Sequence, residues 1–203
     1  MRLTIPNQLT ILRIILTPVF LYLILQSSPA KQLYASIIYT IASLTDWYDG
    51  WYARKFGVIT RLGQFMDPLA DKILVISALI VFAVLGYIIP WMVWVIAIRD
   101  IVITMNRLFA LHVSKPIITH VLAKWKTMLQ MVTIFIILIH LNWLNFYGDG
   151  TKYQAKYFDF IGVLMLIVTM LTVISGIFYI IENRELLLNM FRKIILLQDK
   201  TKR

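Results

Sequence analysis

Residues 46–71 read DWYDGWYARKFGVITRLGQFMDPLAD, and the rest of the chain is best interpreted outward from this stretch. It contains four aspartates, which are Asp46, Asp49, Asp67 and Asp71. An apolar run over residues 34–44 leads into the first of them, and a second run over residues 73–85 follows the last. Because a charge at bilayer depth is costly, ionisable residues beside such runs indicate a functional site.

Helical spacing predicts that these carboxylates gather on two helix faces. The first face carries Asp46, Asp49, Gly50 and Ala53, at positions i, i+3, i+4 and i+7. The second face carries Gly63, Asp67 and Asp71, at i, i+4 and i+8. Each residue alone has an ordinary explanation, such as a helix cap for an Asp, helix packing for a Gly or a topology signal for an Arg. Together they favour a site that holds a ligand.

The chemistry of these side chains suits divalent cations and a phosphate-bearing substrate. Carboxylate oxygens are the ligands that Mg²⁺ and Mn²⁺ prefer. Small residues let a bulky ligand approach the backbone closely, and Arg54 supplies a planar fork that matches phosphate. Two metal ions and an arginine are the equipment for displacement at phosphorus, which is the reaction type that we expect.

The composition is that of an integral membrane protein. Of the 203 residues, 60% are hydrophobic and 15% are charged, and the mean hydropathy is +0.79, whereas soluble domains are nearer half apolar. The net charge of +10 fits a membrane protein beside anionic head groups. The basic residues are spread over many short loops, which argues against nucleic-acid binding. The chain has no cysteine, which excludes disulfides and thiol chemistry.

Six apolar segments predict an all-α bundle of six transmembrane helices in a single domain over residues 1–203. They cover residues 9–25, 33–52, 67–85, 91–111, 121–141 and 158–181. About 20 residues suffice to span a hydrocarbon core of roughly 30 Å. Most Lys and Arg residues near the ends of these segments lie on the N-terminal side, so the positive-inside rule makes that side cytoplasmic. We therefore expect a cell-membrane protein whose aspartates face the cytoplasm.

A second group of charged residues lies in the fourth and fifth predicted helices. Arg99 and Arg107 are spaced i, i+8, near one face, and Lys124 and Lys126 open the fifth helix. The lysines have the alternative of snorkelling at a helix end, and Arg99 with Asp100 could be an internal pair that only orders the bundle. Cations that face a carboxylate site would hold a second anionic group, which suggests an acceptor that carries its own phosphate.

The aspartate stretch resembles the signature of the CDP-alcohol phosphotransferase family. That signature is D-x2-D-G-x2-A-R, a short spacer and G-x3-D-x3-D, and residues 46–71 match every position of it. The resemblance implies that two Mg²⁺ or Mn²⁺ ions bind Asp46, Asp49, Asp67 and Asp71. It implies that Asp71 is either a metal ligand or the general base of the reaction, or both. It also implies that the CDP group contacts Asp46, Asp49, Gly50, Ala53, Arg54, Gly63 and Asn7.

Three further blocks resemble bacterial members of this family that use glycerol 3-phosphate. They are PNQLTILR at residues 6–13, the pair at residues 99–100 with Arg107, and KWKT at residues 124–127. The resemblance implies transfer of a phosphatidyl group from CDP-diacylglycerol to sn-glycerol 3-phosphate, with release of CMP. The acceptor phosphate is then expected at Arg99, Arg107, Lys124 and Lys126. Because the family is commonly dimeric, we expect a homodimer in the lipid bilayer, without a nucleic-acid partner.

Alternative functions remain open at this point. Other members of the family use a different acceptor, as cardiolipin synthases use phosphatidylglycerol and phosphatidylinositol phosphate synthases use inositol phosphate. A protein of another class, a divalent-cation transporter, could use the aspartates as a permeation site. The clustering of the aspartates at one membrane face argues against that alternative.

Overall fold

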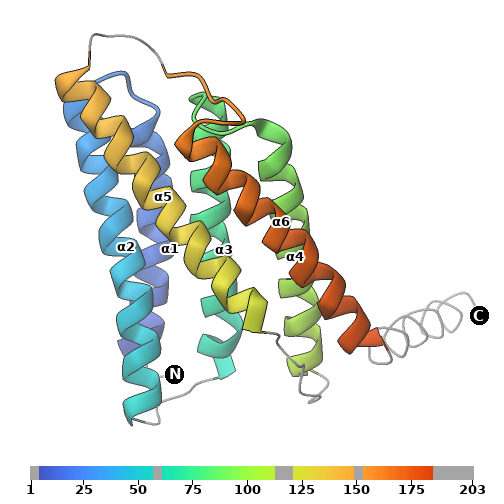
Figure 1. The fold of residues 1–203 in the computed structure, drawn as a ribbon. Coiled ribbons are helices and arrows are strands. Elements are labelled where there is room, and N and C mark those ends of the chain that lie inside the picture. Colours follow the sequence, from blue (N-terminus) through green and yellow to red (C-terminus); the bar gives the residue numbers. More distant parts are fainter. Residues whose placement is uncertain (1–4, 57–60, 113–120, 149–152, 185–203) are drawn as a thin grey trace, which may run out of the picture.

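The computed structural model describes residues 5–56, 61–112, 121–148 and 153–184, and within these ranges it contains six α-helices and no strand. They are α1 (Ile5–Ile24), α2 (Pro29–Phe56), α3 (Arg61–Val84), α4 (Pro90–His112), α5 (Val121–Tyr147) and α6 (Phe160–Glu182). Successive helices alternate in direction, so the end of α2 and the starts of α1, α3 and α5 lie at the same end of the bundle (Figure 1). The all-α prediction is confirmed for these residues.

The helices pack around an apolar core. α1 contacts α2 and α3, α3 also contacts α4 and α5, and α6 contacts α4 and α5. The largest completely buried apolar side chains include Phe20, Tyr39, Phe82, Met92 and Ile134. The rings of Phe20 and Tyr39 join α1 to α2 with their centroids 5.3 Å apart, within the range of favourable aromatic pairs.

Several charged side chains are buried inside the bundle, and many large apolar side chains lie on its surface. Arg13 and Lys126 have no exposed surface, and Asp49 and Asp100 are 4% and 1% exposed. Large apolar side chains point outward instead, as Ile139 does with 68% of its surface exposed. Charged residues are almost never fully buried unless they are paired, and a wide apolar surface indicates an apolar partner or solvent. This distribution therefore fits a protein embedded in lipid.

Hydroxyl side chains inside the bundle form hydrogen bonds within their own helix. Thr17, Thr133 and Thr172 each donate to the carbonyl oxygen four residues earlier. This bond satisfies a buried hydroxyl without water, which a lipid environment cannot supply. Thr17 also precedes Pro18, which lacks an N–H and is tolerated within α1, as prolines are in other membrane helices.

Among the residues that the structure describes, three helices are long and apolar enough to cross a membrane, by length and composition alone. The segments are Asn7–Ile24 of α1, Leu122–Tyr147 of α5 and Phe160–Glu182 of α6. The other helices, α2, α3 and α4, contain 28, 24 and 23 residues, but each carries charged side chains of the candidate site, which lower its hydropathy. A helical membrane protein is therefore supported, and a bundle of six spans stays a prediction.

Several helices extend beyond their predicted limits. α2 begins at Pro29, four residues earlier than predicted, because the fixed φ of proline suits the first helical position. α3 begins at Arg61, so Gly63 shares its helix with the second aspartate pair. α5 continues to Tyr147, six residues beyond the predicted limit at residue 141, so Asn142 and Asn145 belong to the helix.

A polar cap fixes the start of α6 and ties the preceding segment to the bundle. Asp159 accepts a hydrogen bond from the Gly162 N–H at 2.6 Å, and the Tyr153 hydroxyl donates to the same carboxylate. Burial, followed by this hydrogen bond and the charge of Asp159, raises the pKa of Tyr153 above its ordinary value. The Ala155 N–H donates to the carbonyl of Gly86, whose φ of 83° suits a residue without a Cβ atom.

Candidate active site

The end of α2 and the start of α3 bring the four motif aspartates to one end of the bundle. Asp49 is buried, whereas Asp46, Asp67 and Asp71 are half-buried. The charges of Asp67 and Asp71 act on Asp46, and the charges of Asp46 and Asp67 act on Asp49. The two helix faces that carry the aspartates therefore lie within electrostatic range of each other.

Arg13 of α1 lies between the first two aspartates. Its Nη1 atom is 2.7 Å from Asp46 Oδ1, and its Nη2 atom is 2.7 Å from Asp49 Oδ2. The arginine side chain is completely buried, so its charge acts at low dielectric and offsets part of the carboxylate charge. We did not assign Arg13 to the site from the sequence, although an arginine within an apolar run was a signal that could have found it.

α1 also contacts the second aspartate pair. The hydroxyl of Thr10, a buried residue one turn before Arg13, donates to Asp67 Oδ1 at 2.5 Å. Asn7, which is predicted to contact the CDP group, lies one turn earlier and is 5% exposed. The first turns of α1 thus form a third side of the aspartate cluster.

The small residues of the motif share the helices of the aspartates. Gly50 is half-buried beside Asp49 in α2, and Gly63 is buried near the start of α3. Ala53 and Arg54 lie in the last turns of α2, but their side chains fall outside what the structure describes. The role of these two residues in nucleotide binding stays a prediction.

The donor set fits divalent cations, although the carboxylates do not form a closed metal site. Within the described ranges, no three acidic, histidine or cysteine side chains are placed to hold a metal ion together. The guanidinium of Arg13 instead lies between Asp46 and Asp49, so a cation is already favoured there. Carboxylate oxygens are the hard ligands that Mg²⁺ and Mn²⁺ take. The residues fit such ions if Arg13 releases one or both of its carboxylates.

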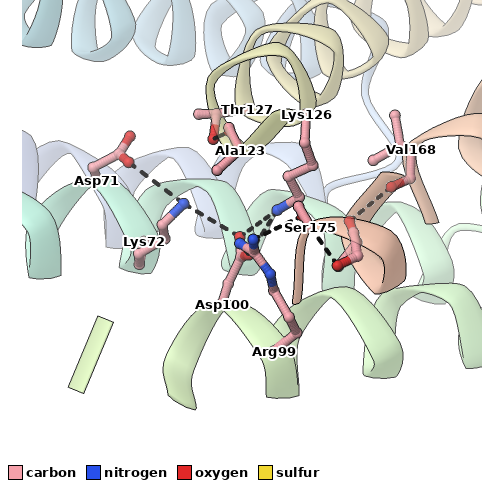
Figure 2. A network of polar contacts seen from close by, with 10 residues as sticks. Asp71, Lys72, Arg99, Asp100, Ala123, Lys126, Thr127, Val168 and Ser175 are labelled. Carbon is pink, nitrogen blue, oxygen red and sulfur yellow. Dashed lines mark hydrogen bonds and ion pairs between the residues drawn. The ribbon is translucent and has the colours of Figure 1, made fainter. Parts of the chain in front are cut away.

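Asp100 is the centre of the second charged group (Figure 2). The Nζ atom of Lys126 lies 2.7 Å from its Oδ1 atom and 2.6 Å from its Oδ2 atom. Arg99 Nη1 lies 3.1 Å from Oδ1, and Lys72 Nζ lies 3.2 Å from Oδ2. The side chains of Asp100 and Lys126 have no exposed surface. One buried carboxylate therefore pairs with three cations from α3, α4 and α5, which is more than an internal Arg–Asp pair.

A pocket of about 390 Å³ opens beside this charged group. Its walls include three of the four cations that are predicted to bind the acceptor, namely Arg99, Arg107 and Lys124. The fourth, Lys126, is not among the described wall residues, and it contacts Asp100, which is one of them. Further polar residues of the walls are Lys72, Asp100, Thr104, Thr127, Ser175 and Tyr179.

Lys72 joins the pocket to the aspartate cluster. Its Nζ atom lies 3.9 Å from Asp71 Oδ2 and 3.2 Å from Asp100 Oδ2, and Figure 2 shows it between the two carboxylates. It also lines the pocket. We did not assign Lys72 to the site from the sequence, although its place directly after the last motif aspartate was a usable signal.

The matched family spans both charged groups. A sequence model of the CDP-alcohol phosphatidyltransferases matches residues 3–175, a range that holds the four aspartates and nearly all of the pocket walls. The chain belongs to the CDP-alcohol phosphatidyltransferase family. The family predicted from the aspartate motif is therefore confirmed.

Relatives within the CDP-alcohol phosphatidyltransferase family resemble the chain over most of its length. A CDP-diacylglycerol–glycerol-3-phosphate 3-phosphatidyltransferase of Bacillus subtilis is 34% identical over 194 residues, which are 90% of this chain and 96% of the relative. A protein of the same name from Wigglesworthia glossinidia brevipalpis is 38% identical over 144 residues, 68% of this chain and 78% of the relative. Another, from Rickettsia bellii, is 32% identical over 176 residues, 86% of this chain and 92% of the relative.

Proposed function

We propose that this protein transfers the phosphatidyl group of CDP-diacylglycerol to sn-glycerol 3-phosphate, giving phosphatidylglycerophosphate and CMP. The names of three relatives describe this reaction, and two of them align with 86% or more of the chain. The protein is then an enzyme of phospholipid synthesis, and its two charged groups serve the two substrates.

The basic pocket beside the aspartates is the observation that carries this proposal. Its described walls hold four cations, Lys72, Arg99, Arg107 and Lys124, and one carboxylate, Asp100. A surplus of partly buried positive charge favours an anionic ligand, because unpaired charges are costly to bury. An uncharged polyol cannot compensate this surplus, and a cationic alcohol would be repelled. The pocket volume of about 390 Å³ suits a small phosphate ester.

The pocket residues would hold the acceptor by its phosphate. Arg99, Arg107 and Lys124 would donate charge-assisted hydrogen bonds to the phosphate oxygens. Lys126 would add its charge from the buried side of Asp100. These contacts leave the far hydroxyl of the acceptor free to reach the aspartate cluster. Lys72 lies between the pocket and this cluster, where it pairs with Asp71.

The chemical step would take place at the aspartates. Asp71 would accept the proton of the acceptor hydroxyl as the general base. The hydroxyl oxygen forms a bond to the phosphatidyl phosphorus while the bond between that phosphorus and the CMP oxygen breaks. The electron pair of the broken bond leaves with CMP.

The donor would lie against the motif residues of α2 and α3. We propose that Asp46, Asp49, Asp67 and Asp71 hold two Mg²⁺ or Mn²⁺ ions, since carboxylate oxygens are the ligands that these ions prefer. When bound, these ions would neutralise charge on the diphosphate and on the leaving CMP. Further proposed contacts to the CDP group come from Asn7, Gly50, Ala53, Arg54 and Gly63.

The setting of the site follows from the same proposal. We place it at the cytoplasmic face of the cell membrane, where a nucleotide-activated donor and a water-soluble acceptor can meet. Six spanning helices would explain why charged side chains point inward and large apolar side chains point outward. A homodimer is proposed from the family alone.

A competition between acceptors tests the proposed reaction. Purified protein in mixed micelles receives CDP-diacylglycerol, Mg²⁺ and equal concentrations of glycerol 3-phosphate, inositol phosphate, phosphatidylglycerol and glycerol, and the lipid products are separated. We expect phosphatidylglycerophosphate to dominate. Another dominant lipid would overturn the choice of acceptor and leave only the family, and no product from any acceptor would overturn the activity itself.

A further inference from the structure

We propose that Lys72 is a catalytic residue whose ammonium group contacts the attacking hydroxyl of the acceptor and stabilises the negative charge that develops on its oxygen. This inference rests on the proposed function above and assigns a role to a residue outside the aspartate motif. It separates the cations of the pocket into those that hold the acceptor phosphate and one that acts on the reacting atom.

The position of Lys72 singles it out among the pocket cations. It lines the pocket together with Arg99, Arg107 and Lys124, but among these four it alone has an ion pair with a motif aspartate in the described structure. That aspartate is Asp71, 3.9 Å away, the proposed acceptor of the hydroxyl proton. A hydroxyl that reaches Asp71 from the pocket therefore arrives beside the Lys72 ammonium.

The ammonium of Lys72 is also available for a new contact. Asp100 is held more closely by Lys126, at 2.6 Å and 2.7 Å, than by Lys72, at 3.2 Å. A lysine ammonium has three N–H donors, and the contacts to Asp71 and Asp100 engage it only at 3.9 Å and 3.2 Å. The side chain is 19% exposed. Lys72 can therefore turn a donor toward the acceptor without leaving Asp100 unpaired, because Lys126 and Arg99 remain.

The proposed role affects a particular kinetic constant. A contact that strengthens only as charge develops on the attacking oxygen lowers the barrier and appears in kcat. A contact to the acceptor phosphate is already present in the bound complex and appears mainly in KM for the acceptor. Lys72 should therefore affect kcat, whereas Lys124 should affect KM for glycerol 3-phosphate.

The first experiment compares Lys72→Gln with Lys31→Gln as a matched control, since Lys31 is an exposed lysine at the far end of α2. We expect Lys72→Gln to lower kcat on the order of a hundredfold, as loss of an oxyanion donor does, with KM for glycerol 3-phosphate within about threefold. Calorimetric binding of glycerol 3-phosphate to the variant should remain close to that of the parent. An unchanged kcat, or a loss that appears in KM and in the binding constant, would overturn the proposal.

A second experiment separates a chemical role from a structural one. A 2-fluoro analogue of glycerol 3-phosphate has a more acidic hydroxyl, so less charge stabilisation is needed at its oxygen. Lys72→Gln should therefore lose less activity with this analogue than with glycerol 3-phosphate, whereas a structural defect lowers both rates by the same factor. Equal losses would overturn the proposal.

A third variant covers poor folding of Lys72→Gln. Lys72→Arg keeps the charge beside Asp71 and Asp100, moves the donor, and should show the same difference between the two acceptors. Equal losses would again contradict a role at the oxygen. The parent protein separates this proposal from the proposed function. If the parent forms no phosphatidylglycerophosphate, the proposed function is wrong. If the parent is active and only the comparisons of the Lys72 variants fail, the role of Lys72 alone is wrong.

Discussion

Replacement of Arg13 by glutamine tests how the aspartate cluster is held together. Arg13→Gln removes the charge that lies 2.7 Å from both Asp46 and Asp49. The side chains of Arg13 and Asp49 are 0% and 5% exposed, whereas that of Asp46 is 37% exposed. Loss of one partner from a buried ion pair costs about 3–5 kcal/mol, and a partly exposed pair adds little. We therefore expect the free energy of unfolding to fall by about 3–5 kcal/mol without divalent ions.

The assay is unfolding of the purified protein in detergent, first with EDTA and then with Mg²⁺ or Mn²⁺. Divalent ions should restore part of the stability of Arg13→Gln, because a dication at Asp46 and Asp49 would take over the charge of the arginine. Arg184→Gln, at an exposed position after α6, is the matched control and should change little under either condition.

Two results would contradict different parts of this reasoning. If Arg13→Gln and Arg184→Gln unfold alike in EDTA, Arg13 does not balance the aspartates. If Arg13→Gln is destabilised in EDTA and divalent ions restore nothing, the balance stands and the proposed place of the metal ions is wrong. Neither readout depends on catalytic activity.

Three further predictions follow from the charged groups and from the cap of α6. Asp67→Asn should abolish phosphatidyl transfer in a radiolabelled micelle assay while the protein still folds, and normal activity would contradict the metal role of Asp67. Lys126→Ala should raise KM for glycerol 3-phosphate about ten- to a hundredfold, because Asp100 would then compete with the phosphate for Arg99. KM for CDP-diacylglycerol should stay unchanged, and equal changes in both constants would count against this role of Lys126. Burial and then Asp159 raise the pKa of Tyr153 in the folded state. The protonated side chain of Tyr153 therefore contributes its full stabilisation of the fold below the ordinary tyrosine pKa of about 10, and this stabilisation is lost as the pH rises above that value. Tyr153→Phe should therefore show a flatter alkaline decline of the unfolding midpoint than the parent, and parallel curves would exclude this role.

The sequence was most informative where local periodicity decides the structure. Asp46 and Asp49, and likewise Asp67 and Asp71, are spaced so that any helix places each pair on one face. The structure adds that α3 begins at Arg61, several residues before the apolar run. The predicted segment began six residues later, at residue 67, because the small and charged residues at the start of α3, among them Gly63 and Asp67, interrupt its apolar pattern. Functional charges therefore hid a helix end that an ordinary apolar segment would have revealed.

Pairings between distant residues could not be predicted in the same way. Arg13 and Asp49 are separated by 36 positions and Lys126 and Asp100 by 26, and only the packing of the bundle brings them together. From the sequence, Lys126 was assigned to the acceptor phosphate, and no spacing rule could show that Asp100 already holds it. Periodicity assigns a residue to a helix face, whereas the neighbour of that face depends on tertiary structure.

The two charged groups stabilise each other because they are of opposite sign. The aspartates outnumber Arg13 on one side, and the described cations of the pocket outnumber Asp100 on the other. Either surplus alone would be costly to bury, but side by side they attract, and Lys72 contacts both. In the proposed reaction, metal ions with the donor would offset the negative surplus and the acceptor phosphate would offset the positive one. Asp71 and Asp100 would then have other positive charges beside them, so the ammonium of Lys72 could turn toward the attacking oxygen as negative charge develops on it.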